Sequence, residues 1–134
     1  MNVMRKKQDT PEIIATLDAE KSSLLLEAHV LSITNQPDEA IERYALAAPM
    51  EERIAAFYER QGDPIMAARS RFSAATCYAF SGSLREALRI FDALGRGADA
   101  LGYYKGDAIL WAGRLRQQQR DALQVYRQPM QSAA

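Results

Sequence analysis

The sequence predicts an all-α fold in which about five or six helices pack antiparallel. Apolar residues recur at intervals of three and four along most of the chain, which places them on one face of a helix. Glycine, asparagine and proline separate these segments at positions where one helix would end and the next begin. No run alternates apolar and polar residues, and no hairpin dipeptide joins two β-branched segments, so we expect no strand.

The clearest helix–turn–helix pattern lies between Arg69 and Leu94. Gly82 is expected to end the first helix, because glycine adopts a positive φ without a steric penalty. Ser83 is expected to cap the second helix, with Glu86 completing a capping box. Such a short turn makes the two helices pack antiparallel. The facing apolar stripes would consist of Ala68, Phe72, Ala75, Tyr78 and Ala79 in the first helix, and of Leu84, Ala87, Leu88, Phe91 and Leu94 in the second.

Two helices are expected before this pair. Thr10 and Pro11 form a helix start, with threonine as the cap and proline in the first turn. The apolar stripe that follows extends to about Thr34. Asp18 opens a polar patch that could divide this segment into two helices, but we favour one long helix.

The next helix is expected to begin at Pro37 and to meet a second proline, Pro49, in its interior. Proline lacks a backbone donor and disfavours helical backbone in the residue before it, so it either ends or kinks a helix. We favour one kinked helix over residues 37–61. This single helix would then lie between two equivalent first helices, one that ends near Thr34 and one that ends near Ser81.

Further boundaries divide the second half of the chain. Residues 62–64, Gly-Asp-Pro, would end one helix and begin the next. Residues 95–97 form a flexible glycine joint, residues 99–104 form a turn or two of helix, and Asp107 caps a last helix that ends near Arg127. The predicted organisation is an N-terminal disordered arm at 1–9, one helical-repeat domain at 10–128 and a tail at 129–134.

Two segments within residues 21–94 carry small, apolar, acidic and aromatic residues in the same order and spacing around a turn. The matching positions are Leu24, Ala28, Asn35, Glu39, Ala40, Ile41, Tyr44 and Ala47, and then Ala75, Tyr78, Gly82, Glu86, Ala87, Leu88 and Phe91. These segments resemble the tetratricopeptide-repeat family. This resemblance implies a right-handed stack of helical hairpins whose first helices line a concave groove for another protein. A resemblance to the longer and more divergent repeats of soluble attachment proteins of vesicle fusion is weaker.

The resemblance also implies which residues line the groove. Repeats that clamp a C-terminal carboxylate use lysine and asparagine at positions that here carry apolar residues, threonine or histidine. The groove would therefore favour an apolar or amphipathic segment. In that case, the replacement Phe72→Ala would weaken binding and leave the fold intact. The groove residues carried over are Ser22, Leu25, His29, Arg69, Phe72, Thr76 and Phe80.

Charge is distributed unevenly, although the chain as a whole has a formal net charge of zero. Residues 1–67 contain 7 basic and 12 acidic residues, whereas residues 68–134 contain 10 basic and 5 acidic residues. The two halves thus have net charges of −5 and +5. Compositional drift is one interpretation, and head-to-tail association or steering of a partner is the other.

Several classes of protein are disfavoured by composition. No apolar run approaches the ~20 residues of a membrane span, and the basic N-terminus lacks the apolar segment of a signal peptide. Cys77 has no second cysteine to pair with, so we expect a cytoplasmic protein without an intrachain disulfide. His29 is the only histidine, which argues against a metal site and favours a structural role. The glycines at 95–106 fit no phosphate-binding motif, and no cofactor is expected.

We therefore expect a non-catalytic protein–protein interaction module, acting as a scaffold, adaptor or chaperone. The acidic residues at 51, 52 and 59 are assigned to a solvated helix face rather than to an active site. A self-assembling homo-oligomer is the first alternative. A nucleic-acid-binding regulator is the second, because aromatic and basic residues alternate between Tyr103 and Arg120. The same pattern also describes core aromatics beside solvated arginines, which we favour.

Overall fold

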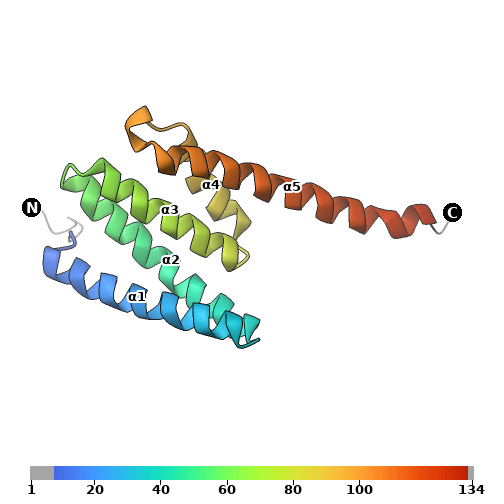
Figure 1. The fold of residues 1–134 in the computed structure, drawn as a ribbon, viewed down its shortest axis with the longest axis horizontal. Coiled ribbons are helices and arrows are strands. Elements are labelled where there is room, and N and C mark those ends of the chain that lie inside the picture. Colours follow the sequence, from blue (N-terminus) through green and yellow to red (C-terminus); the bar gives the residue numbers. More distant parts are fainter. Residues whose placement is uncertain (1–7, 133–134) are drawn as a thin grey trace, which may run out of the picture.

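A computed structural model describes residues 8–132, and all regular structure within them is helical, as the sequence predicts. Helices α1, α2 and α3 lie side by side, α4 packs against α3, and α5 crosses one end of the stack (Figure 1). The C-terminal half of α5 projects beyond the other helices (Figure 1). The elements are α1 (Pro11–Ile33), α2 (Pro37–Arg60), α3 (Pro64–Phe80), α4 (Leu84–Gly95), the short 3₁₀ helix η1 (Asp99–Leu101) and α5 (Tyr103–Ser132).

The three turns that join α1 to α4 share one backbone geometry. Asn35, Gly62 and Gly82 have φ values of 61°, 74° and 85°. In each turn the next residue donates its N–H to the carbonyl five residues earlier, at 2.8–2.9 Å, which is the Schellman arrangement. The helix ends predicted at Gly62 and Gly82 are confirmed, and Asn35 ends α1 in the same way. Because all three turns are this short, each helix packs antiparallel to the one before it.

Side-chain caps begin two of the helices as expected. The Thr10 hydroxyl accepts the N–H of Ile13 at 3.3 Å, and the Asp63 carboxylate accepts the N–H of Met66 at 3.1 Å. The capping box at Ser83 is wrong, since its side chain makes no cap hydrogen bond. The carboxylate of Glu86 instead accepts a hydrogen bond from Arg89 at 2.9 Å.

Helices α1 and α2 are each continuous. No break occurs at Asp18, and Pro49 does not end α2. Pro49 and Ala45 are both exposed, so the Ala45 carbonyl that loses its helical donor faces solvent. On the opposite face Ala47 and Ala48 are fully buried and pack against α3, which holds the helix together across the proline.

The beginning and end of α5 differ from the prediction. The helix begins at Tyr103 rather than at Asp107, because Gly102, with φ 49°, already turns the chain and Gly106 is accommodated inside the helix. The helix also continues past Arg127 to Ser132. Of the predicted disordered arm and tail, residues 1–7 and 133–134 lie outside the described residues.

A core rich in alanine joins α3, α4 and α5 around Phe91. The Phe91 ring has no exposed surface, stacks on Trp111 at a centroid distance of 5.4 Å, and meets Phe72 edge-on at 5.5 Å. Small side chains let the three helices approach closely around these rings. The buried alanines of this cluster are Ala68, Ala74, Ala75, Ala87, Ala108 and Ala112.

One carboxylate connects three helices at the edge of this core. Glu52 of α2 accepts hydrogen bonds from the Tyr78 hydroxyl of α3 at 2.5 Å and from Arg89 of α4 at 3.0 Å. Burial and the hydrogen bond to Glu52 together raise the pKa of Tyr78 far above its ordinary value, so the phenol remains a donor.

We expect Phe91→Ala to lower the free energy of unfolding by about 3–5 kcal/mol, because it leaves a cavity between two aromatic rings. Phe80→Ala is the matched control. The Phe80 side chain is 51% exposed, so this change should cost about 1 kcal/mol. Urea unfolding followed by circular dichroism measures both. Equal losses would contradict the assignment of Phe91 as the centre of the core.

Candidate functional site

A cleft of about 350 Å³ separates α1 from α3, with α2 as its floor. The turn geometry produces it, because α1 and α3 both pack against α2 and run in the same direction. Side chains spaced three and four residues apart on each helix point into the same space. The lining consists of Asp18, Lys21 and Leu25 from α1, Glu51, Ile54 and Tyr58 from α2, and Met66, Arg69, Ser70 and Ser73 from α3.

The floor of the cleft contains a buried ion pair. Glu51 is only 3% exposed, and its carboxylate lies 3.4 Å from the Lys21 ammonium, which also contacts Asp18 at 3.1 Å. Burial by itself would lower the pKa of Lys21, but the negative charges of Glu51 and Asp18 outweigh it and raise this pKa. The two charges at the floor are thus satisfied within the chain.

Cys77 lies behind this floor, packed with Ala47 and Ala48. Burial, reinforced by the charge of Glu51, raises the pKa of the thiol to about 12, and Lys21 opposes the shift. The thiolate is the reactive form of cysteine, so this side chain is chemically inert at neutral pH.

The wall formed by α3 carries one available cation. Arg69 is exposed and forms no ion pair with any residue in the described part of the chain, whereas Arg71, two positions later, pairs with Glu59 of α2. A guanidinium binds carboxylates with two parallel hydrogen bonds. Arg69 is therefore the group in the cleft best suited to recognise an acidic side chain of a ligand.

The cleft contains two of the seven groove residues predicted from the sequence, Leu25 and Arg69. Ser22 and His29 lie exposed on α1 and do not line it. Thr76 is half-buried on α3, and its hydroxyl donates a hydrogen bond to the carbonyl of Ser73 at 2.8 Å.

Both aromatic residues predicted for the groove lie elsewhere. Phe72 is half-buried and contacts Phe91 at 5.5 Å and Tyr104 at 5.9 Å between ring centroids, so it belongs to the core shared with α4 and α5. Phe80 packs between Tyr44 of α2 and Trp111 of α5. We now expect Phe72→Ala to reduce stability. Residue spacing indicates one face of α3 but not which neighbour covers that face.

The ion pair at the floor is not predicted from the sequence. The expectation of a solvated face is wrong for Glu51, because α1 and α3 both pack against α2 around it. Lys21 belongs to the polar patch that begins at Asp18. One signal was present, because Lys21 shares the inward stripe of α1 with Leu17 and Ala28, both buried.

The aromatic and basic segment between Tyr103 and Arg120 is built largely into the fold. Trp111 stacks on Phe91, Lys105 pairs with Asp99 at 2.8 Å, and Arg116 pairs with Asp92. Over residues 8–132, no group of three or more His, Cys, Asp or Glu side chains could hold a metal ion. None of the described helices combines the length and apolar character needed to cross a membrane.

Comparison with protein-family models, with curated proteins and with solved structures finds no significant match for this chain. The tetratricopeptide-like pattern accordingly rests on the residues and turns of this chain alone.

We expect Lys21→Met to lower the free energy of unfolding by about 2–4 kcal/mol at neutral pH, because it leaves the Glu51 carboxylate buried without a counter-ion. The double variant Lys21→Met/Glu51→Gln should recover most of this loss. Because the pKa of Lys21 is raised, the difference between wild type and Lys21→Met should persist from neutral pH up to about 10.4 and shrink above it. Asp18→Asn, at an exposed partner, should cost less than about 1 kcal/mol. A double variant no more stable than Lys21→Met would contradict the pairing.

A native thiol assay tests the environment of Cys77. At a pH of about 8 an ordinary thiol is partly ionised, whereas Cys77 should be almost fully protonated and shielded from reagent. Modification by a disulfide reagent should be at least about 100-fold slower in the folded than in the urea-unfolded protein. Equal rates would show that the Cys77 thiol is open to solvent in the folded protein.

Proposed function

We propose that this protein is a non-catalytic interaction module that binds an amphipathic segment of another protein in the cleft between α1 and α3. The observation that carries the proposal is the cleft itself, which has an internally paired floor and an available arginine on its wall. Lys21 and Glu51 neutralise one another, so a ligand does not have to compensate a buried charge.

The remaining lining determines which segment would fit. Leu25, Tyr58 and Met66 are half-buried and offer apolar contact surface within the cleft. Arg69 offers a charge-assisted contact to a carboxylate. A helical or extended segment with apolar side chains on one side and an acidic residue beside them satisfies both features.

The resemblance to tetratricopeptide repeats supports the same use of this face. In such stacks the first helix of each hairpin lines the binding groove, and here α1 and α3 are those helices. A role as scaffold, adaptor or chaperone follows from this resemblance, because the activity of such a module is determined by its partner.

The proposal is tested by selecting ligands from a displayed library of random peptides on the wild-type protein. We expect the enriched peptides to combine an apolar face with at least one acidic residue. Arg69→Glu should weaken their binding at least about tenfold, since it replaces an attractive contact with a repulsive one. Ser73→Trp, which fills the cleft, should abolish binding.

Arg85→Glu is the matched control, because Arg85 is also exposed but lies on α4 and does not line the cleft. Isothermal titration calorimetry gives the affinities, and circular dichroism confirms that the variants fold. Peptides that bind Arg69→Glu and Ser73→Trp as tightly as wild type would place the binding surface elsewhere and refute the proposal.

A further inference from the structure

Helix α1 is apolar on two opposite faces, but the described part of the chain covers only one of them. The inner face, with Ile14, Leu17 and Ala28, is buried against α2. On the outer face Leu26 is 66% exposed and Ile33 is 69% exposed. A contiguous exposed apolar face of this kind marks an interaction surface. Val30 is also exposed on this outer face, and the 100° helical step adds Ala15 and Ala19 to it.

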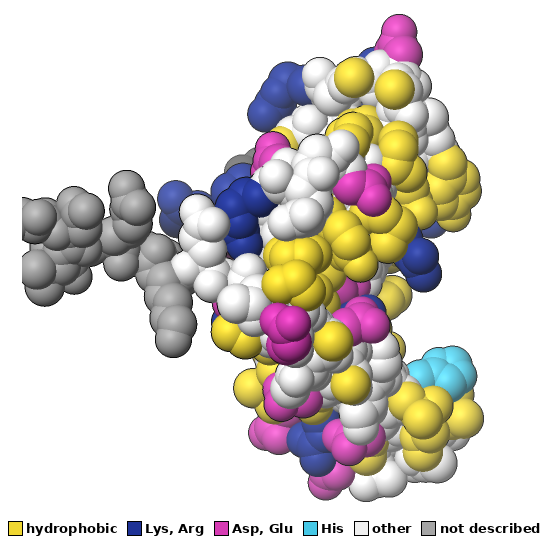
Figure 2. All heavy atoms as spheres, turned by 90° about the vertical axis from the view of Figure 1, so that its left-hand side faces the viewer, with side chains coloured by type: hydrophobic (Ala, Val, Ile, Leu, Met, Phe, Trp, Pro, Cys, Tyr) yellow, Lys and Arg dark blue, Asp and Glu magenta, His cyan; other side chains and the backbone are white. Residues whose placement is uncertain are grey.

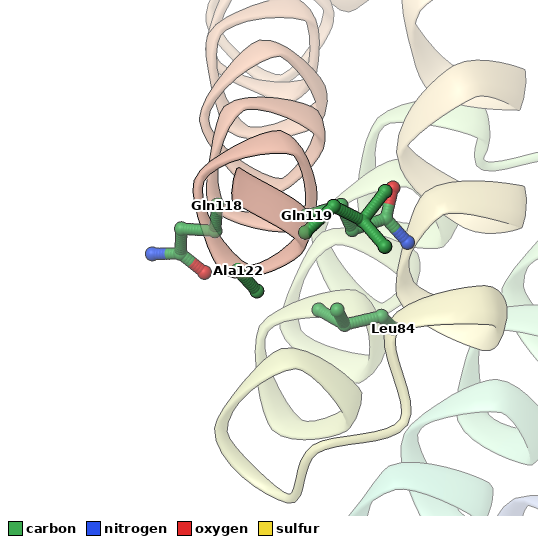
Figure 3. Close-up of a pocket in the computed structure, with 5 residues that line it drawn as sticks. Leu84, Gln118, Gln119 and Ala122 are labelled. Atoms are coloured by element: carbon green, nitrogen blue, oxygen red, sulfur yellow. The ribbon is translucent and has the colours of Figure 1, made fainter. Parts of the chain in front are cut away.

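The opposite end of the stack has an uncovered groove. Helix α4 begins at Leu84, and α5 extends well past this point (Figure 1). The inward stripe of α5, which is buried at Leu115, continues to Ala122 with nothing described packed against it. Leu84 and Ala122 border an open groove of about 610 Å³ between α4 and α5 (Figure 3). Leu123, which is 57% exposed, also lines the groove.

The helices that carry these two uncovered surfaces have opposite net charge. Helix α1 contains four acidic residues and one basic residue, a net charge of −3. Helix α5 contains five basic and two acidic residues, a net charge of +3. In Figure 2 acidic side chains predominate over α1 and α2, in the lower part of the view. Glu20 and Glu27 lie exposed on α1, and Arg114 and Arg120 lie exposed on α5.

We propose that the partner of both surfaces is a second copy of this chain: the outer face of α1 of one molecule docks into the groove between α4 and α5 of the next. Burial of Leu26 and Val30 against Ala122 and Leu123 would supply the apolar contact. The opposite charges of the two helices favour this contact and steer it. Two-fold pairing of α1 with α1 is disfavoured, because it joins two helices that each have a net charge of −3.

The contact is heterologous, so a bound pair retains one free α1 face and one free groove. Copies would therefore add to one another in an open chain or close into a ring. This inference uses surfaces outside the cleft between α1 and α3, and it stands or falls separately from peptide binding there.

Analytical ultracentrifugation over a range of protein concentrations tests the proposal with two variants, Leu26→Glu and Leu123→Glu. Both side chains are exposed, so the variants should fold as wild type does, and circular dichroism checks this. We expect wild type to associate in a concentration-dependent manner. Each variant alone should associate at least about tenfold more weakly, because it places a carboxylate in an apolar contact.

Mixing the two variants provides the decisive measurement. The intact groove of Leu26→Glu should bind the intact α1 face of Leu123→Glu, so a mixture should form a dimer that neither variant forms alone. Leu110→Glu is the matched control, since Leu110 is exposed on α5 but does not line the groove. This variant should associate as wild type does.

Salt provides a further test. Raising NaCl from about 0.05 M to about 0.5 M should weaken association several-fold, because the flanking charges are exposed. Three results would overturn the proposal: a monomeric wild type at all concentrations, undiminished association of Leu123→Glu, or no dimer in the mixture. Association that is unchanged by salt would show that opposite charges do not stabilise the contact. The argument for a second copy as the partner would then fail.

Discussion

The positive φ of three turn residues is the constraint on which the arrangement of this stack depends. Asn35, Gly62 and Gly82 each reverse the chain within three residues and satisfy the last carbonyls of the preceding helix. Every helix from α1 to α4 must then lie antiparallel to its predecessor. Helices α1 and α3 consequently share one face of α2. The cleft between them therefore depends on the geometry of the turns more than on the side chains that line it.

Alanine determines how closely the helices pack, and it leaves few large side chains to exclude water between α1 and α3. Ala47, Ala48, Ala67 and Ala74 are all fully buried. Between α1 and α3 such small residues leave a space that only longer side chains can occupy. Lys21 and Glu51 occupy it, and their mutual attraction offsets part of the cost of removing both charges from water.

Features determined by a few neighbouring residues could be predicted from the sequence, and features determined by packing could not. The turns, the cap at Thr10 and the helix start at Pro64 are local and were found. The predicted capping box at Ser83 does not form, and Glu86 accepts a hydrogen bond from Arg89 instead. The burial of Glu51 and the core position of Phe72 depend on which helix lies alongside, and residue spacing within one helix contains no such information.

The hydrogen bonds that converge on Glu52 couple the helices in the unfolding of the molecule. Because this one carboxylate holds Tyr78 of α3 and Arg89 of α4, separating any of these helices leaves a polar group without its partner. We therefore expect helices α2, α3 and α4 to unfold as one cooperative unit, with amide protons that exchange with solvent together. Among the side chains that the structure describes, the part of α5 beyond Arg116 makes no such bond to α2, α3 or α4, so its helical turns can open without breaking the hydrogen bonds at Glu52.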